Sequence, residues 1–356
     1  MRPWMLALGI GCAKAAPVVA PPPEAPAVLP APDGEVYTAA PATPRDPVVA
    51  QAADGLPWDE SLSGAGTTLV LDAAPVDLAR ARWAAWRAGY PHPVVQVVEG
   101  RGAPGAVPDG LPALLDGLLL PGDHLGLVRA RAPGADRWVA IVGRPVVAIG
   151  PVPRRLGPGA ALQIDVPAGA AVSVVSPDGR LLRSVGPTAL PALGAGVWWV
   201  DVRTADGVAA AAFPVAVGVD PPREPPVPLP GAPASGPSGA AASLLDAINA
   251  WRAAAGLAAV RPEPALASLA ARPLEGLLVG AFDAPAAERR LEAAGFVGGP
   301  RAALSCVAAT PALCVDGWAR DAPARVALLH PGLRLAGVAA EVRTDGLSAV
   351  LLLSAE

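Results

Sequence analysis

The sequence predicts a multidomain protein in which α/β regions flank an all-β region. Three observations support this fold class. Helical and strand patterns alternate up to residue 150, short strands separated by turns continue to residue 220, and helical patterns return after residue 240. Segments rich in proline and alanine, 13–62 and 221–240, separate these regions and have the composition of a tether and a linker. We therefore expect folded domains over 63–150, 151–220 and 241–356.

Composition limits the classes of function that the chain can have. Its 356 residues are enough for two or three domains, and hydrophobic residues make up 53% of them. A net charge of −4 with dispersed arginines provides no basic surface for nucleic acid. No apolar run approaches the roughly 20 residues that a membrane-spanning helix needs. We expect neither a nucleic-acid partner nor a transmembrane helix.

The N-terminal residues 1–12 contain a basic Arg2, a short apolar run and small residues before Cys12. This order resembles the signal of bacterial lipoproteins, and the resemblance implies that Cys12 is lipidated. The tether over 13–62 would then join a lipid anchor to the folded domains. The resemblance predicts a cell-envelope protein, either an outer-membrane lipoprotein or a periplasmic or secreted one. A plain N-terminal tail with an incidental cysteine is the alternative.

The first domain, 63–150, has the pattern of a small α/β layer. Its helices are expected where apolar residues recur at helical spacing, and its strands where apolar runs are short and continuous. The expected elements are a strand over 67–72, a helix over 76–90, a strand over 94–98, a helix over 111–120, and a hairpin formed by 124–131 and 138–149. His92 is expected on an exposed turn between two prolines, and His124 at a strand start. Neither has a sequence neighbour that indicates catalysis.

The second domain, 151–220, has the pattern of an all-β fold. Apolar and polar residues alternate around Ile164 and Val174, and the sequence from Ser176 to Gly179 is a turn signal. Strand patterns recur over 197–202 and 213–219. Short strands at intervals of about ten residues with glycine and proline turns predict a β-sandwich of the immunoglobulin-like type. This architecture does not specify a function.

The third domain, 241–356, carries an ordered series of motifs. Ser243 is expected to cap a helix beginning at Leu244, and Pro264 to start a second helix. The further motif residues are Asn249, Arg252, Gly256, Leu257, Arg289, Leu291, Ala294, Gly295, Phe296, Trp318, Arg325, Leu328, Leu329, Pro331, Gly337 and Val338. In order and spacing these resemble the CAP (SCP/PR-1-like) family. The resemblance implies an α-β-α sandwich that ends in a hairpin.

The polar cluster of that family is missing from this sequence. In the family, two histidines and two acidic residues line a cleft that binds a divalent metal in some members. The resemblance places the first histidine near Arg272-Pro273, one acid near Ser305 and the last histidine at Ala324. Glu275 matches the other acid, but a lone carboxylate is a weak metal site. The degenerate cleft positions are therefore Glu275, Ser305, Ala324 and Arg325, and we expect no metal, no cofactor and no catalytic residue.

These patterns predict a multidomain binding or structural protein of the cell envelope with a degenerate, non-catalytic CAP-like domain. Its partner could be an envelope protein, a glycan or a lipid, and the sequence does not say which. One alternative is an envelope hydrolase that uses residues without a recognisable motif. Another is a lipid-binding CAP protein, which follows only from what some family members do.

Cys306 and Cys314 are expected to form a structural disulfide. The envelope is oxidising, and seven residues, VAATPAL, lie between the two cysteines. A turn near Pro311 would bring their Cα atoms within the range that a disulfide needs. The alternative is a continuous helix through both cysteines, which would hold them about 12 Å apart by helical rise and forbid the bond.

Overall fold

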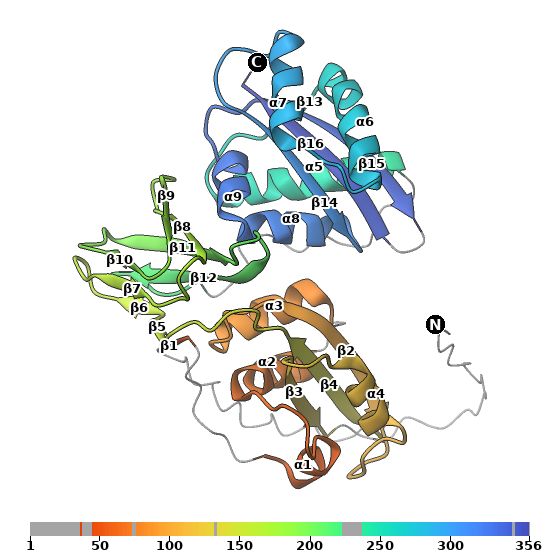
Figure 1. Ribbon diagram of the computed structural model, residues 1–356. Helices are drawn as coiled ribbons and strands as arrows, with labels where there is room; N and C mark the ends of the chain where they lie inside the picture. The colour runs from red at the N-terminus through yellow and green to blue at the C-terminus, as the bar shows by residue number, and fades with distance from the viewer. Residues whose placement is uncertain are drawn as a thin grey trace, which may run out of the picture. The chain divides into compact units, whose positions relative to one another are not determined.

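The computed structural model describes residues 36–37, 45–72, 76–131, 134–222, 237–343 and 346–355, and Figure 1 labels their helices and strands. The predicted signal over 1–12, with Cys12, and most of the linker over 221–240 lie outside the described residues. Within the described ranges, no helix combines the length and the apolar character needed to cross a membrane.

The α/β region is built on a three-stranded antiparallel sheet with strand order β2-β4-β3. Val139 and Ile141 of β4 pack against α2 and α3, whereas Trp138 and Ala140 pack against α1 and α4. Alternate residues of one strand therefore face two helical layers, as the pleat of a strand requires. The elements are α1 (Pro47–Ala52), α2 (Glu60–Leu71), α3 (Leu78–Arg87), β2 (Val94–Gly102), α4 (Leu111–Leu118), β3 (His124–Ala130) and β4 (Asp136–Gly143).

The strand expected over 67–72 is wrong, because residues 67–71 belong to α2 and Asp72 caps its C-terminal end. The carboxylate of Asp59 caps that helix by accepting a hydrogen bond from the backbone N–H of Leu62 at 2.9 Å. Leu62 and Leu69 of α2 are buried against the sheet. A capped helix with a buried face continues through Thr67 and Thr68, although β-branched residues favour strands.

The expected tether also ends earlier than residue 62. α1 and the start of α2 lie inside it, and a short strand, β1 (Val36–Tyr37), pairs with β5 (Val152–Pro153). Tyr37 is fully buried, and its hydroxyl donates a hydrogen bond to the carbonyl of Pro214 at 2.7 Å. Proline-rich composition therefore concealed segments that contribute apolar side chains to the core.

The middle region is all-β, as expected. Its main sheet has the order β6-β12-β11-β8-β9, and a second, two-stranded sheet pairs β10 with β7. The buried core between them also takes in Tyr37 and Trp86, which come from outside the region. The immunoglobulin-like topology is not confirmed. The strands are β6 (Arg155–Leu156), β7 (Leu162–Ile164), β8 (Ala171–Val175), β9 (Leu181–Val185), β10 (Thr188–Leu190), β11 (Gly196–Arg203) and β12 (Ala209–Val217).

The C-terminal region has helices on both faces of a four-stranded sheet with order β13-β15-β16-β14. Leu351 of β16 faces the core formed with α5, α8 and α9, whereas Leu352 faces the core formed with α6 and α7. The elements are α5 (Pro237–Ala254), β13 (Arg261–Pro262), α6 (Pro264–Leu278), α7 (Ala284–Ala293), β14 (Arg301–Ala308), α8 (Pro311–Arg320), α9 (Ala322–Leu328), β15 (Leu335–Arg343) and β16 (Gly346–Ser354).

Two motif positions of this region have clear structural explanations. A Cβ atom on Gly337 would overlap the backbone of Leu266, so glycine lets α6 approach β15 closely. Pro264 lies in the first turn of α6, as expected. The expected cap at Ser243 is wrong, because α5 begins at Pro237 and Ser243 lies within the helix. The proline-rich composition before residue 240 concealed the helix start.

Candidate functional site

The structure does not bring the four degenerate cleft positions together. Glu275 lies on α6, and Ala324 and Arg325 lie on α9. These helices pack against opposite faces of the sheet, so the sheet separates Glu275 from Arg325. Ser305 lies within β14, and its backbone carbonyl accepts a hydrogen bond from the indole nitrogen of Trp318 at 2.9 Å. Residues with this placement do not fit the divalent metal site that the family resemblance suggests.

Glu275 lines an open pocket of about 440 Å³ between α6 and α7. Arg272 and Arg290 also line this pocket, and they provide positive charge where the resemblance would place part of a metal site. Asp283 lines it as well, and its carboxylate caps α7 by accepting from the N–H of Ala286 at 3.0 Å. Within the described parts of the chain, no three histidine, cysteine or acidic side chains converge as metal ligands.

Arg252, from the motif in the first C-terminal helix, is a fully buried structural residue. Its guanidinium donates hydrogen bonds to backbone carbonyls that follow α5 or lie at and beyond the end of α9. The acceptors are the carbonyls of Ala258 at 2.9 Å, Leu328 at 2.5 Å, His330 at 3.2 Å and Leu333 at 3.4 Å. Burial lowers the pKa of Arg252, and the nearby positive charge of Arg334 lowers it further. The motif therefore fastens α5 to the chain that leaves α9.

Asn249, one helical turn before Arg252, binds the backbone between α5 and β13. Its side-chain amide donates to the carbonyl of Val260 at 3.0 Å and accepts from the backbone N–H of Val260 at 2.9 Å. A side-chain amide offers a donor and an acceptor side by side, so it can pair with the N–H and the C=O of one residue as a strand would. Hydrogen bonds within the protein therefore explain Asn249 and Arg252, and neither motif residue needs a ligand to explain it.

Arg325, which the family resemblance assigns to the cleft, is buried in a different environment. The residue is 9% exposed, and its guanidinium carbon lies 3.9 Å from the ring centroid of Trp199 and 5.4 Å from that of Trp251. One guanidinium nitrogen donates to the carbonyl of Ala319 at 3.0 Å. Burial lowers the pKa of Arg325 to about 9. The guanidinium therefore joins α9 and α5 to β11, the strand that holds Trp199.

A network of charged residues surrounds this stack on β11 and α9. Asp201 is buried, and its carboxylate accepts from Arg203 at 3.1 Å and from the backbone N–H of Ala322 at 3.3 Å. Arg203 also pairs with Asp321, whose carboxylate caps α9 by accepting from the N–H of Ala324 at 2.8 Å. Burial raises the pKa of Asp201, and the charge of Arg203 opposes that rise.

We call this arrangement the α9–β11 contact, formed by Trp199, Asp201, Arg203, Asp321 and Arg325. A second contact lies nearby, where Arg82 of α3 pairs with Asp316 of α8 at 3.2 Å. Burial lowers the pKa of Arg82, and the carboxylate of Asp316 opposes that effect. Helices α8 and α9 are therefore joined both to the all-β region and to the α/β region.

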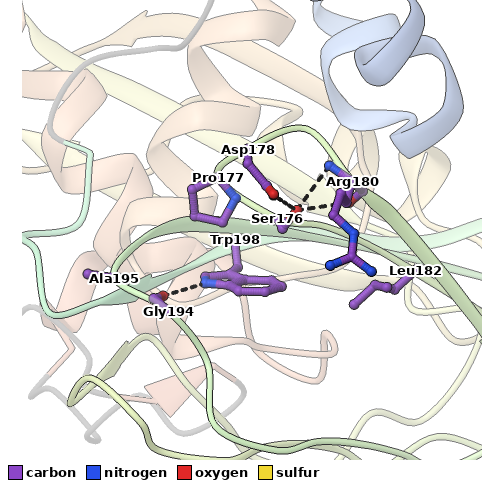
Figure 2. Close-up of a pocket in the computed structure, with 8 residues that line it drawn as sticks. All are labelled: Ser176, Pro177, Asp178, Arg180, Leu182, Gly194, Ala195 and Trp198. Carbon is purple, nitrogen blue, oxygen red and sulfur yellow. Dashed lines mark hydrogen bonds between the residues drawn. The ribbon is translucent and has the colours of Figure 1, made fainter.

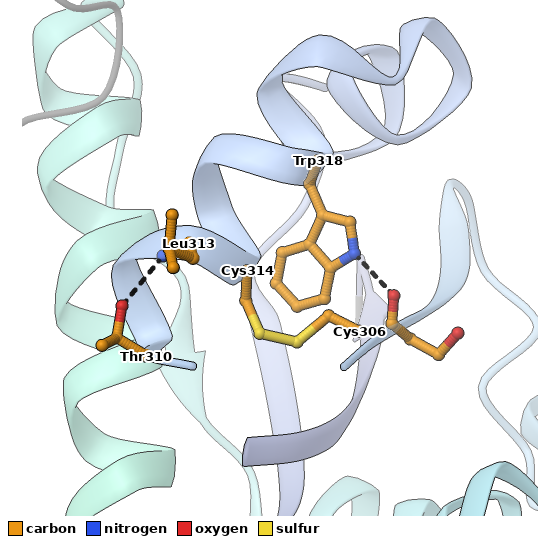
Figure 3. The surroundings of a disulfide bond; sticks show 6 residues. Cys306, Thr310, Leu313, Cys314 and Trp318 are labelled. Carbon is orange, nitrogen blue, oxygen red and sulfur yellow. Dashed lines mark hydrogen bonds between the residues drawn. A yellow bond between two sulfur atoms is a disulfide. The ribbon is translucent and has the colours of Figure 1, made fainter. Parts of the chain in front are cut away.

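The structure joins Cys306 of β14 and Cys314 of α8 in a disulfide, which confirms the expected pairing (Figure 3). Their Cα atoms are 5.6 Å apart. The continuous helix of the alternative is absent, because β14 ends at Ala308 and α8 begins at Pro311. The hydroxyl of Thr310 caps α8 by accepting from the N–H of Leu313 at 3.3 Å, as Figure 3 shows. The disulfide thus anchors the first turn of the helix that precedes α9.

His92 and His124 are closer to polar groups than the sequence suggested. Both rings pack edge-on against Tyr90, with ring centroids 5.4 Å and 6.1 Å from it. His124 faces Asp59 at 3.4 Å, a carboxylate that comes from a distant part of the sequence. His92 is half-buried, and its Nδ1 lies 3.2 Å from the carbonyl of Ala210, so the expected exposed turn is wrong. Burial lowers the pKa of His92.

Comparisons with known proteins give a limited result. No family model matches the sequence, and no curated protein matches it. The structure of a cysteine-rich secretory protein from Staphylococcus aureus subsp. aureus Mu50 is similar with a TM-score of 0.29 and 12% sequence identity, covering 55% of this chain and 82% of that one. This likeness is weak.

Sequence reasoning missed the partners of Arg325. Trp199 lies in a strand expected from the VWWVDV pattern, and Trp251 lies on the first C-terminal helix. Nothing in the spacing of these residues indicates that they meet, because 126 positions separate Trp199 from Arg325. The available signal was chemical: Trp199, Trp251 and Arg325 are large side chains in segments rich in alanine and valine.

Proposed function

We propose that the protein is a multidomain binding or structural protein of the cell envelope whose CAP-like C-terminal region carries no catalytic site. The observation that carries this proposal is the environment of Arg325. The family resemblance assigns this residue to the cleft, yet its guanidinium is enclosed between Trp199 and Trp251. A side chain held in this way joins parts of one chain, and it is not available to a substrate.

The placement of the remaining cleft positions supports the same proposal. Catalysis and metal binding both need polar groups that converge on one point. Glu275 lies across the sheet from Arg325, and Ala324 has no polar side chain. The α9 segment instead presents Asp321 to Arg203 of β11. The CAP-like region would therefore act through the surfaces that it fixes in place.

The envelope location rests on two features. The N-terminal residues resemble a lipoprotein signal, and a disulfide joins Cys306 to Cys314. Disulfides persist in oxidising compartments, to which such a signal directs a protein. Fractionation of cells that express the full chain tests this part of the proposal. We expect the protein in the membrane fraction, and release of the Cys12→Ala variant into the soluble fraction.

Hydrogen–deuterium exchange on the full chain tests whether α9 is held as proposed. We expect slow exchange at the backbone amides of 325–329 and faster exchange there in the Trp199→Ala variant. Val185→Ala is the matched control, because Val185 is 71% exposed on β9, which β8 separates from β11 in the sheet. Rapid exchange of α9 in the unmodified protein would contradict the proposal. Calorimetric titration with zinc, calcium and magnesium adds a second criterion, since micromolar binding would restore the metal-site alternative.

A further inference from the structure

A small pocket opens at one end of the all-β region, and none of its lining residues belongs to the α9–β11 contact. Its volume is about 250 Å³. The turn between β8 and β9 and the loop between β10 and β11 form its rim (Figure 2). The lining residues are Ser176, Pro177, Asp178, Arg180, Leu182, Gly194, Ala195 and Trp198. The residues from Ser176 to Gly179 have the pattern of a turn, but nothing in the sequence indicates a pocket beside it.

The wall of the pocket is apolar and firmly held. Trp198 contributes its indole, whose N–H donates to the carbonyl of Gly194 at 2.9 Å. This hydrogen bond fixes the ring against the loop that forms one rim. A Cβ atom on Gly196 would overlap the side chain of Pro177. Glycine at position 196 therefore lets the β8–β9 turn and the β10–β11 loop approach each other closely. The shape of the pocket is therefore set before any ligand binds.

The loop that forms this rim also stores backbone strain. Ala192 has a φ of 51° and is the one non-glycine residue with positive φ in the described part of the chain. Such a conformation costs about 1–3 kcal/mol, and strain of this kind clusters at binding and catalytic sites. Ala192 lies two residues before Gly194, which lines the pocket.

Arg180 provides a positive charge at the rim. Figure 2 shows its guanidinium beside Leu182, extending away from Asp178. The structure gives this guanidinium no hydrogen bond or ion pair with any described residue, although the backbone N–H of Arg180 donates to the Ser176 hydroxyl at 3.0 Å. The carboxylate of Asp178 accepts from that same hydroxyl, so it is already engaged within the turn. The group at the rim that remains for a ligand is a guanidinium, which binds carboxylates through paired hydrogen bonds.

The neighbouring strand suggests how a ligand could extend from the pocket. β9 follows Arg180 directly and is the last strand in the order β6-β12-β11-β8-β9. Among the described strands, β9 pairs with β8 alone. An edge strand can accept an extended peptide, whose backbone supplies hydrogen bonds while a pocket holds one of its side chains.

We propose that this pocket binds the C-terminal residue of a peptide chain, with an apolar side chain against Trp198 and the terminal carboxylate on Arg180. A cavity of about 150 Å³ holds benzene, so a pocket of about 250 Å³ has room for one aromatic side chain. The inference deepens the binding role proposed above and rests on it.

The test is a calorimetric titration of the full chain with the acetylated tripeptide alanyl-alanyl-phenylalanine and with its C-terminal amide. The two peptides differ only in the carboxylate. We expect the acid to bind about tenfold more tightly than the amide, because a charged hydrogen-bonded pair is lost in the amide. Arg180→Gln should remove this difference without affecting the fold, since Arg180 is exposed.

Arg183→Gln is the matched control. Arg183 lies on the same strand and is also exposed, but it pairs with Ser173 on the sheet face opposite Leu182. This variant should keep the preference for the acid. The proposal would be overturned if the acid and the amide bound equally tightly, or if neither peptide bound. It would also be overturned if Arg180→Gln and Arg183→Gln reduced the preference for the acid to the same extent. Binding of phenylacetate as tight as that of the tripeptide would also overturn it, since it would identify a free aromatic acid as the ligand.

The two proposals fail in different experiments. Loss of peptide binding would leave slow exchange at α9 and the absence of metal binding as predicted. Rapid exchange at α9 or micromolar metal binding would contradict the proposed function while leaving the peptide titration unaffected, because the pocket residues take no part in the α9–β11 contact.

Discussion

Arg252 and Arg325 are both buried in the C-terminal region, but they are satisfied in different ways. Arg252 donates to four backbone carbonyls, all from its own region of the chain. Arg325 donates to one carbonyl and otherwise lies between two indole rings, one of them on β11. The comparison separates two roles for a buried guanidinium. Arg252 holds the C-terminal region together, whereas Arg325 holds it to another region.

The two environments imply different costs of substitution. Replacing Arg252 leaves buried carbonyls without donors, and each such group carries a desolvation penalty. Replacing Arg325 with an apolar residue of similar size leaves few polar groups unsatisfied and also removes the cost of burying a charge. The predictions below follow this difference, from the largest expected effect to the smallest.

Arg252→Met should destabilise the protein most. We expect the free energy of unfolding to fall by about 4 kcal/mol, because two buried and two partly buried carbonyls lose their hydrogen bonds. Urea denaturation of the full chain measures this loss. Arg261→Met is the control, since Arg261 is exposed on β13 and its replacement should change stability by less than about 0.5 kcal/mol. Similar effects for the two substitutions would show that Arg252 does not hold the region together.

The disulfide should contribute the next largest effect. Replacing Cys306 and Cys314 together with alanine should lower the free energy of unfolding by about 2.5 kcal/mol, because the bond restricts a short loop of the unfolded chain. Reduction of the unmodified protein should cause a similar loss and should leave the double variant unchanged. Two titratable thiols in the unreduced, denatured protein would contradict the pairing.

The depressed pKa of Arg325 predicts an unusual dependence of stability on pH. The pKa of an arginine in the unfolded chain lies well above 9, whereas burial lowers the pKa of Arg325 in the folded protein to about 9. Between these values the unfolded chain binds more protons than the folded one, so stability rises with pH. The burial penalty is fully present below about pH 9 and is relieved above it.

The measurement compares the free energies of unfolding of the unmodified protein and of Arg325→Met at each pH. The contributions of the other titrating groups cancel in the difference. The free energy of unfolding of the unmodified protein should rise relative to Arg325→Met by at most about 1.4 kcal/mol for each pH unit above pH 9. Arg261→Met is again the control, because Arg261 is exposed on β13. The low pKa of Arg325 would be contradicted if the difference in the free energy of unfolding between the unmodified protein and Arg325→Met stayed constant with pH.

The sequence predicted much of the local structure. Capping residues, glycines and apolar spacing placed the helices α3, α4 and α6 and the final hairpin close to their observed positions. The spacing of Cys306 and Cys314 was enough to predict their disulfide. These features depend on residues that are near one another in the chain, so a sequence pattern can reveal them.

The errors had a different physical origin. The segment over 67–72 favours a strand by composition, but burial of Leu69 against the sheet holds it in a helix. The expected tether contains Tyr37, whose burial depends on Phe213 and other distant residues. The partners of Arg325 were missed for the same reason. A contact between distant segments leaves no periodic signal in either of them.

A double-mutant cycle between Trp199 and Arg325 tests the central claim most directly. The free energies of unfolding of Trp199→Leu, Arg325→Met and the double variant give the energy that couples the two side chains. We predict a favourable coupling of about 1 kcal/mol, because the guanidinium lies over the indole in a buried site. Trp199→Leu paired with Arg261→Met should be additive within about 0.5 kcal/mol. A coupling of zero between Trp199 and Arg325 would contradict the claim that Arg325 joins α9 to β11.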